Sequence, residues 1–163
     1  MASWIKCAYA LAAALVLQAS VPAAASLGES GAAPNRAEAV RLIRSTLDAI
    51  NDANVTANYS VLHGLGSPEF QSAYPVATLA QQLGGMRDRH LDLGIAVSLE
   101  PIITNAAFNV SGNIVQLVGY FPTAPARLTF RLSYKYVDSR WALHGFDLGL
   151  DKAPEAPHAD RGA

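Results

Sequence analysis

The stretch "NDANVTANYSVLHGLGSPEF", residues 51–70, decides the fold of this chain. It follows an amphipathic helix pattern that starts at the capping residue Asn35 and has apolar residues at spacings of three and four, namely Val40, Ile43, Leu47 and Ile50. From Asn51 onward, Asn, Asp, Val and Thr residues crowd together and offer side-chain hydrogen bonds that compete with the helix. The stretch therefore predicts a long helix that breaks and changes direction.

Short helical segments follow the break. Thr56 or Asn58 is placed to cap a second, short helix. Ser67 followed by Pro68 is typical of a new helix start, because serine caps the helix and proline fits its first turn. A further helical segment follows Pro75.

The second half of the chain predicts four β-strands, at residues 100–109, 113–122, 127–137 and 141–150. The third strand alternates most clearly and puts one set of residues on the face that meets the helices: Leu128, Phe130, Leu132, Tyr134 and Tyr136. In the fourth strand the alternation changes at Gly145, which predicts a β-bulge there. In the second strand we expect Val115, Leu117 and Phe121 on the outer face.

The order of these elements, together with "DAINDANVTANYSVLHGLGSPEF" (residues 48–70), resembles the nuclear-transport-factor-2-like superfamily, in particular its small secreted bacterial members of unassigned function. The resemblance implies an α+β fold shaped like a cone, as in cystatin-like folds. A broken long N-terminal helix and two short helices would pack on a curved four-stranded antiparallel sheet, and the domain would cover residues 35–150.

The first 25 residues are typical of a secretory signal peptide, with one lysine, an apolar run and a small-residue end at Ala23-x-Ala25. The alternative is an uncleaved membrane anchor, but Gln18 and Pro22 interrupt the run. Cleavage predicts a secreted or periplasmic protein that is free of the membrane and lacks cysteine, because Cys7 leaves with the signal. Gly, Ala, Pro and charged residues predict a flexible segment at 26–34 and a disordered tail at 151–163.

The charge balance of 12 Lys and Arg against 13 Asp and Glu does not favour nucleic-acid binding, which needs a basic face. We expect no metal and no cofactor. The alternation of Asp88, His90 and Asp92 would converge on a metal only in an extended segment, and a solvated helix end is the competing interpretation. Three Asn-x-Ser/Thr triplets start at Asn54, Asn58 and Asn109, and with a bacterial-type leader we interpret them as turn and hinge residues rather than glycan acceptors.

Enzymes of the resembling superfamily, such as ketosteroid isomerases and related dehydratases, place an Asp, or an Asp and a His, inside the cone. Here the inner face of the third strand carries no carboxylate. We therefore expect an exported non-catalytic domain that binds a small apolar ligand or a protein partner. The expected ligand-binding residues are aromatic: Tyr59, Tyr120, Phe130, Tyr134 and Trp141.

The alternative is a cofactor-independent isomerase or lyase acting on a small apolar substrate in the cone. Its candidate catalytic residues are His63, His144 and Asp147, which would serve as acid and base. The alternative interpretation is structural: the two histidines would be packed or lie at the rim, and Asp147 would be exposed. An apolar outer face on the second strand would favour a homodimer through that face of the sheet.

Overall fold

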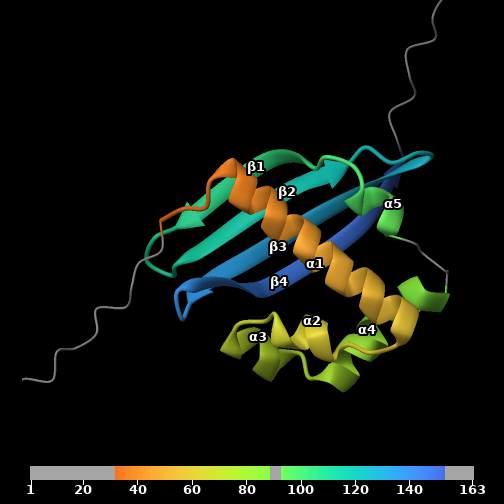
Figure 1. Cartoon of the computed structure of the whole chain (residues 1–163), viewed down its shortest axis with the longest axis horizontal. Helices are drawn as coiled ribbons and strands as arrows, with labels where there is room; N and C mark the ends of the chain where they lie inside the picture. The colour runs from red at the N-terminus through yellow and green to blue at the C-terminus, as the bar shows by residue number, and fades with distance from the viewer. Residues whose placement is uncertain (1–31, 89–92, 153–163) are drawn as a thin grey trace, which may run out of the picture.

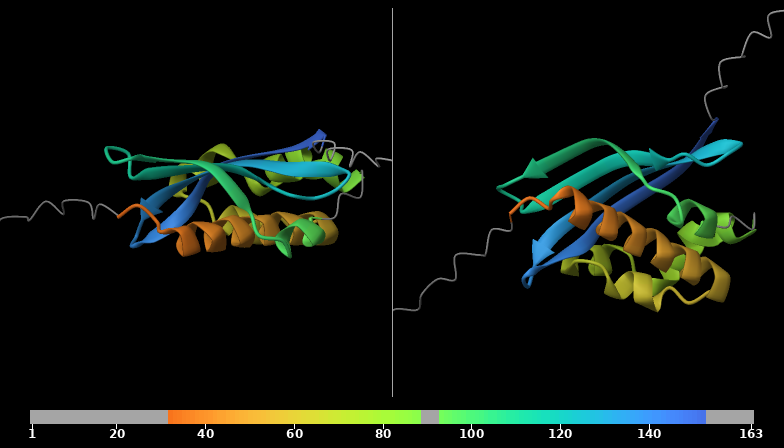
Figure 2. Two further views of the ribbon diagram at one scale, coloured as in Figure 1. Left: turned by 90° about the horizontal axis from the view of Figure 1, so that it is seen from above. Right: turned by 45° about the horizontal axis from the view of Figure 1, so that its top comes forward.

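A four-stranded antiparallel sheet and five helices make up the fold in our computed structural model, which describes residues 32–88 and 93–152. The strands lie in the order of the sequence: β1 (Ile102–Asn109), β2 (Ile114–Phe121), β3 (Ala126–Val137) and β4 (Arg140–Lys152). Helix α1 (Arg36–Thr56) crosses one face of the sheet, and the next three helices gather beside β4 (Figure 1). The views from above and at an angle show the sheet curving around α1 (Figure 2). The expected α+β class is confirmed.

Helix α1 begins as the sequence predicts, since the Asn35 side chain accepts a hydrogen bond from the Glu38 amide at 3.0 Å. Its apolar stripe is fully buried at Ile43, Leu47 and Ile50. The helix continues to Thr56, past the expected break at Asn51. The reason is tertiary packing: Asn54 is buried and accepts a hydrogen bond from the Tyr59 hydroxyl at 3.2 Å, and this bond holds the last turn against the chain that follows.

The chain turns at Ala57, whose φ of 58° is left-handed, and enters three helices: α2 (Ser60–Gly64), α3 (Pro68–Ala73) and α4 (Val76–Asp88). The Asn58 side chain accepts from the Ser60 amide at 3.1 Å, and the Ser67 hydroxyl accepts from the Phe70 amide at 3.3 Å. The predicted start of α3 at Ser67–Pro68 is therefore confirmed, whereas the predicted cap of α2 at Thr56 or Asn58 is wrong: Tyr59 occupies that position without a side-chain cap, and Asn58 forms a turn just before it. A fifth helix, α5 (Gly94–Val97), precedes the sheet and is not apparent in the sequence pattern.

The free side of β4 is covered by the chain between α2 and α3. Gly66 forms a parallel bridge with Leu143, the Ser67 amide donates to the Leu143 carbonyl at 2.7 Å, and the Leu143 amide donates to the Leu65 carbonyl at 2.9 Å. The sequence does not predict this contact, because a two-residue bridge leaves no periodic pattern.

The two faces of the sheet separate clearly in β3 and were predicted wrongly in β2. Leu128, Phe130, Leu132 and Tyr134 are buried against the helices, as expected. Val115, Leu117 and Phe121, expected on the outer face, are 3%, 1% and 0% exposed, and the Phe121 ring lies 5.6 Å from the Phe130 ring on the inner face. The strand "IVQLVGYF" has apolar residues on both faces, so its period alone does not identify the inner one.

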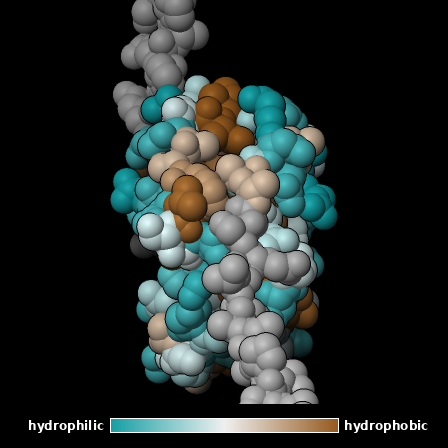
Figure 3. Space-filling view, turned by 90° about the vertical axis from the view of Figure 1, so that its left-hand side faces the viewer, coloured by the Kyte–Doolittle hydropathy of each residue, from teal (hydrophilic) through white to brown (hydrophobic). Residues whose placement is uncertain are grey.

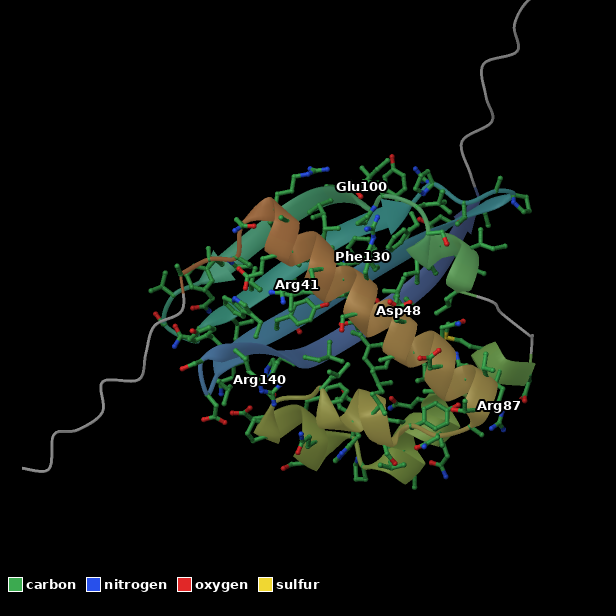
Figure 4. The ribbon with its side chains drawn as sticks, viewed as in Figure 1. Arg41, Asp48, Arg87, Glu100, Phe130 and Arg140 are labelled. Atoms are coloured by element: carbon green, nitrogen blue, oxygen red, sulfur yellow. The ribbon has the colours of Figure 1, made fainter. Side chains whose placement is uncertain are left out.

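The backbone of β1 passes close to Gly119 on β2. A Cβ atom at this position would lie 2.1 Å from the Ile102 carbonyl oxygen and 2.8 Å from the Phe130 ring. Only glycine fits without displacing backbone. The core beneath is filled with side chains, and Phe130 lies between the sheet and α1 (Figure 4).

Candidate functional site

The five aromatic residues expected to bind a ligand do not form one site. Tyr59, Phe130 and Tyr134 are 1%, 2% and 2% exposed and belong to the packed core. Tyr120 lies on the outer face of the sheet, where the Arg127 guanidinium stacks 4.8 Å from its ring centre. Trp141 is half-buried at one end of the inner face. Of the five, Trp141 alone therefore lies at an accessible part of the inner face.

Tyr134 has a structural role in this core. Its hydroxyl donates to the Leu42 carbonyl at 2.9 Å and lies 2.9 Å from the Thr46 hydroxyl, which then donates to it. Burial raises the pKa of Tyr134 well above that of a free tyrosine, while the Thr46 hydrogen bond lowers it less. The group stays protonated at neutral pH and ties α1 to β3.

The three candidate catalytic residues have different neighbours in different parts of the fold. His63 on α2 donates from Nε2 to the Gln71 carbonyl at 3.2 Å. His144 occupies the predicted bulge in β4, where the pairing shifts between Ser133 and Tyr134, and its Nδ1 lies 3.0 Å from the Ser67 hydroxyl. Ser67 is fully buried and caps α3, so this pair fixes the α3–β4 contact.

Asp147 is exposed on the opposite, outer face of the sheet, where the pairing of β3 with β4 sets it across from Arg131. The bulge does not turn Asp147 inward, because Phe146 and Leu148 take the inner positions on either side of it. The three residues therefore share no cavity.

A groove opens where the start of α1 passes over β1 and β2, at the end of the molecule away from α2–α4. We name it the mouth groove. Its cavity volume is about 360 Å³. Its apolar lining consists of Ala33, Pro34, Ala39, Ile103, Ala106, Phe108, Val115 and Leu117, and its polar lining of Arg36, Thr104 and Asn105. Figure 3 faces this end and shows apolar side chains gathered in its upper half.

An aromatic cluster adjoins the mouth groove along the inner face. The Trp141 ring lies 6.1 Å from the Phe108 ring and 5.2 Å from the Tyr136 ring, both in edge-on orientations. Because Phe108 itself lines the groove, Trp141 lies one ring away from it. The cluster therefore extends the apolar surface from β1 across to β4.

The electrostatics of the mouth groove do not favour proton transfer. Arg36 is the one ionisable residue among its described lining, and it faces Glu100 at 3.9 Å. Glu100 also binds Arg44 at 2.9 Å, and Arg44 donates to the Leu99 carbonyl at 3.1 Å. These contacts join the first half of α1 to the segment before β1.

One carboxylate elsewhere has a perturbed acidity. The ion pair between Glu69 on α3 and Lys135 on β3 lowers the pKa of Glu69 to about 2. Both side chains are solvent-accessible, so the pair contributes little to stability and is screened by salt. It lies outside the mouth groove and has no apparent catalytic partner among the described residues.

Two other cavities are less suited to an apolar ligand than the mouth groove. One, of about 370 Å³, lies between α4 and the end of β3 and β4, beside Gly85 and Met86, close to the point where the described chain stops at Asp88. Another, of about 420 Å³, lies on the outer face among charged residues that include Arg127, Arg131 and Asp147. The mouth groove presents more apolar surface than either of them.

Within residues 32–88 and 93–152 no group of three or more His, Cys, Asp or Glu side chains is arranged to hold a metal ion. Of the Asp88, His90 and Asp92 alternation, the last two residues lie outside the described residues, as do the expected signal peptide, Cys7 and most of the expected tail. None of the described helices has the length and apolar character needed to span a membrane. Comparison with protein-family models, with curated proteins and with solved structures finds no match to this chain.

Proposed function

We propose that the protein is an exported, non-catalytic binding domain whose mouth groove takes a small apolar ligand. The observation that carries the proposal is the groove itself: about 360 Å³ of space between α1 and the β1–β2 hairpin, lined mainly by apolar side chains. A volume of this size suits a small molecule, and a few polar groups at the rim, such as Arg36 and Thr104, would orient it. The order of helices and strands supports membership of the nuclear-transport-factor-2-like superfamily as part of the same proposal.

No observation on the described residues specifically supports the isomerase or lyase alternative. None of His63, His144 and Asp147 is among the described residues that line the groove. Two of them are engaged in contacts that fix α2, α3 and β4, and the third faces solvent on the other side of the sheet. An acid–base reaction needs a proton acceptor within hydrogen-bond reach of the substrate, and the lining offers no carboxylate or imidazole.

The test uses the fluorescence of Trp141, which is the only tryptophan in a chain that begins at Ser26. Because its ring lies 6.1 Å from that of Phe108, an apolar ligand in the groove should change its emission. A screen of apolar metabolites, read by emission and by thermal shift, should yield binders that raise the melting temperature.

A matched pair of variants locates the binding. Ile103→Thr places a hydroxyl in the groove and should weaken binding at least about fivefold, because buried apolar surface is lost. Ile102→Thr makes the same change at the neighbouring residue, which is 41% exposed and pairs with Tyr120 of the outer face, and should leave binding unchanged. Equal effects from the two changes, or turnover of a ligand that His144→Ala abolishes, would contradict the proposal.

A further inference from the structure

The two edges of the sheet differ in whether another described segment pairs with them. On the β4 side, main-chain hydrogen bonds to Leu143 from the Leu65–Ser67 segment cover the edge. On the other side β1 ends the sheet, and no described strand pairs with its free edge. Figure 1 shows β1 along the upper border of the sheet with α1 in front of the face rather than over the edge. The main-chain groups on that side of β1 are a ready template for another strand.

The free edge has only one of the features that usually protect an edge strand against pairing. Charged side chains and prolines commonly keep edge strands apart. Here no Asp, Glu, Lys, Arg or His occurs anywhere from Pro101 to Ala126, a range that includes all of β1 and β2, and β1 contains no proline. One protective feature is present: the pairing with β2 shifts between Ile103 and Asn105. The unbroken part of the strand is therefore Asn105–Asn109.

We propose that β1 pairs with β1 of a second copy of this chain, antiparallel through Asn105–Asn109, to form a homodimer with one continuous sheet. A two-fold axis at Ala107 uses the whole unbroken segment and none of the shifted part. It sets Ala107 opposite itself, Ala106 opposite Phe108 of the second copy, and Asn105 opposite Asn109 of the second copy. An isologous interface requires this kind of self-complementarity.

The side chains match across this register. On the inner face, the small and exposed Ala106 meets the large Phe108 of the second copy, so a ring covers the space that alanine leaves open. On the outer face, two pairs of asparagine amides and a central pair of alanines meet, with no like charges opposed. The pairing also covers the exposed side of the mouth groove at Ala106.

The outer face of the sheet is a poorer surface for the same purpose. The apolar residues expected there, Val115, Leu117 and Phe121, are buried inside. The outer face instead carries charged side chains of both signs, among them Arg127, Arg131 and Asp147, and burying them between two copies would cost desolvation free energy. We therefore assign the dimer to the edge.

The experiment is mass measurement in solution by light scattering and sedimentation on the exported chain and on three single variants. The native chain should have twice the monomer mass at micromolar concentration. Ala107→Lys and Ala107→Glu each place like charges opposite one another at the two-fold axis, and each should raise the dimer dissociation constant at least about tenfold. A mixture of the two should restore a dimer, because opposite charges then meet.

Gln116→Lys is the matched control, because Gln116 is exposed on β2 directly across from Ala107 but lies one strand inside the edge. It should remain dimeric, whereas a dimer through the outer face would lose affinity. Circular dichroism that matches the native spectrum shows that each variant is folded. A monomeric native chain at high micromolar concentration, dimers that survive Ala107→Lys, or equal loss in Gln116→Lys would overturn the proposal.

Discussion

Replacing Tyr134 by phenylalanine removes one buried hydroxyl and almost no volume. In the folded protein this hydroxyl joins Leu42 and Thr46 on α1, each at 2.9 Å, and Tyr134 and Thr46 are both 2% exposed. The variant leaves the Thr46 hydroxyl without this partner in the core. We expect a loss of about 1–3 kcal/mol in the free energy of unfolding. With urea slopes of about 1–3 kcal/mol/M, the unfolding midpoint should fall by roughly 1 M.

The companion change, Thr46→Val, separates the two hydrogen bonds. Valine keeps the shape of threonine, and the Tyr134 hydroxyl can still donate to the Leu42 carbonyl. We expect a smaller loss of about 0.5–1.5 kcal/mol. The double variant should show a coupling of at least about 0.5 kcal/mol, because both changes remove the same contact. Additive losses would show that the two hydroxyls do not interact.

The same residue predicts a dependence on alkaline pH. Burial raises the pKa of Tyr134 in the folded state, so the folded protein holds this proton more tightly than the unfolded chain, where a free tyrosine loses it near about pH 10. The stabilisation is present in full below about pH 10 and is lost as the pH rises further. The difference in unfolding free energy between the native protein and Tyr134→Phe should therefore be constant up to about pH 10 and should narrow steadily as the pH rises above that value towards the raised pKa of the folded state. A difference below about 0.5 kcal/mol at pH 7, or one that stays constant with pH, would refute the reasoning.

Three further predictions concern stability. Leu47→Ala should cost about 2–5 kcal/mol in urea unfolding because Leu47 is fully buried, whereas the exposed Asp48→Ala should stay within about 0.5 kcal/mol; equal losses would mean that α1 is rotated. Gly119→Ala should lower the free energy of unfolding by about 1–3 kcal/mol, because the new Cβ clashes with β1. Gly85→Ala has open space around its Cβ and should raise the free energy of unfolding by about 0.5–1 kcal/mol through α4. Changes of the same sign in the two variants would contradict the geometry. The lowered pKa of Glu69 stabilises the folded protein in full above about pH 4.5, and this stabilisation is lost as the pH falls to about 2. In thermal scans the melting temperature of the native protein should therefore fall slightly over this range, by an amount that salt reduces. Glu69→Gln should not show this part of the fall.

The fold was predictable where one physical signal dominates. The cap at Asn35, the buried stripe of α1 and the serine–proline start of α3 depend on neighbouring residues alone, and all three are confirmed. The end of α1 was not predictable in this way, because Asn54 stays helical through a hydrogen bond with Tyr59 that forms only in the folded chain. The face of β2 was predicted wrongly for a similar reason, since both of its faces are apolar and the register with β3 decides between them.

The candidate site was less predictable than the fold. Aromatic residues in a sequence show that a surface is apolar but not whether side chains or space lie beside it, so Tyr59, Phe130 and Tyr134 were interpreted as lining when they fill the core. Part of the space in the mouth groove comes from small residues, such as Ala39 and Ala106, whose short side chains leave room between larger neighbours. In an amphipathic pattern such positions count only as weakly apolar, so no feature of the sequence predicts the groove.

The mouth groove and the free edge of β1 meet at Ala106 and Phe108, so the two proposals are thermodynamically linked. In the proposed register Phe108 of the second copy stands beside Ala106 and extends the groove wall instead of filling the groove. A ligand should then touch more apolar surface in the dimer than in the monomer, and by reciprocity it should strengthen the dimer. Sedimentation with and without a bound ligand measures this directly, and Ala107→Lys should bind the same ligand more weakly although its groove residues are unchanged. A ligand that dissociates the dimer would mean that Phe108 of the second copy enters the groove and competes for it.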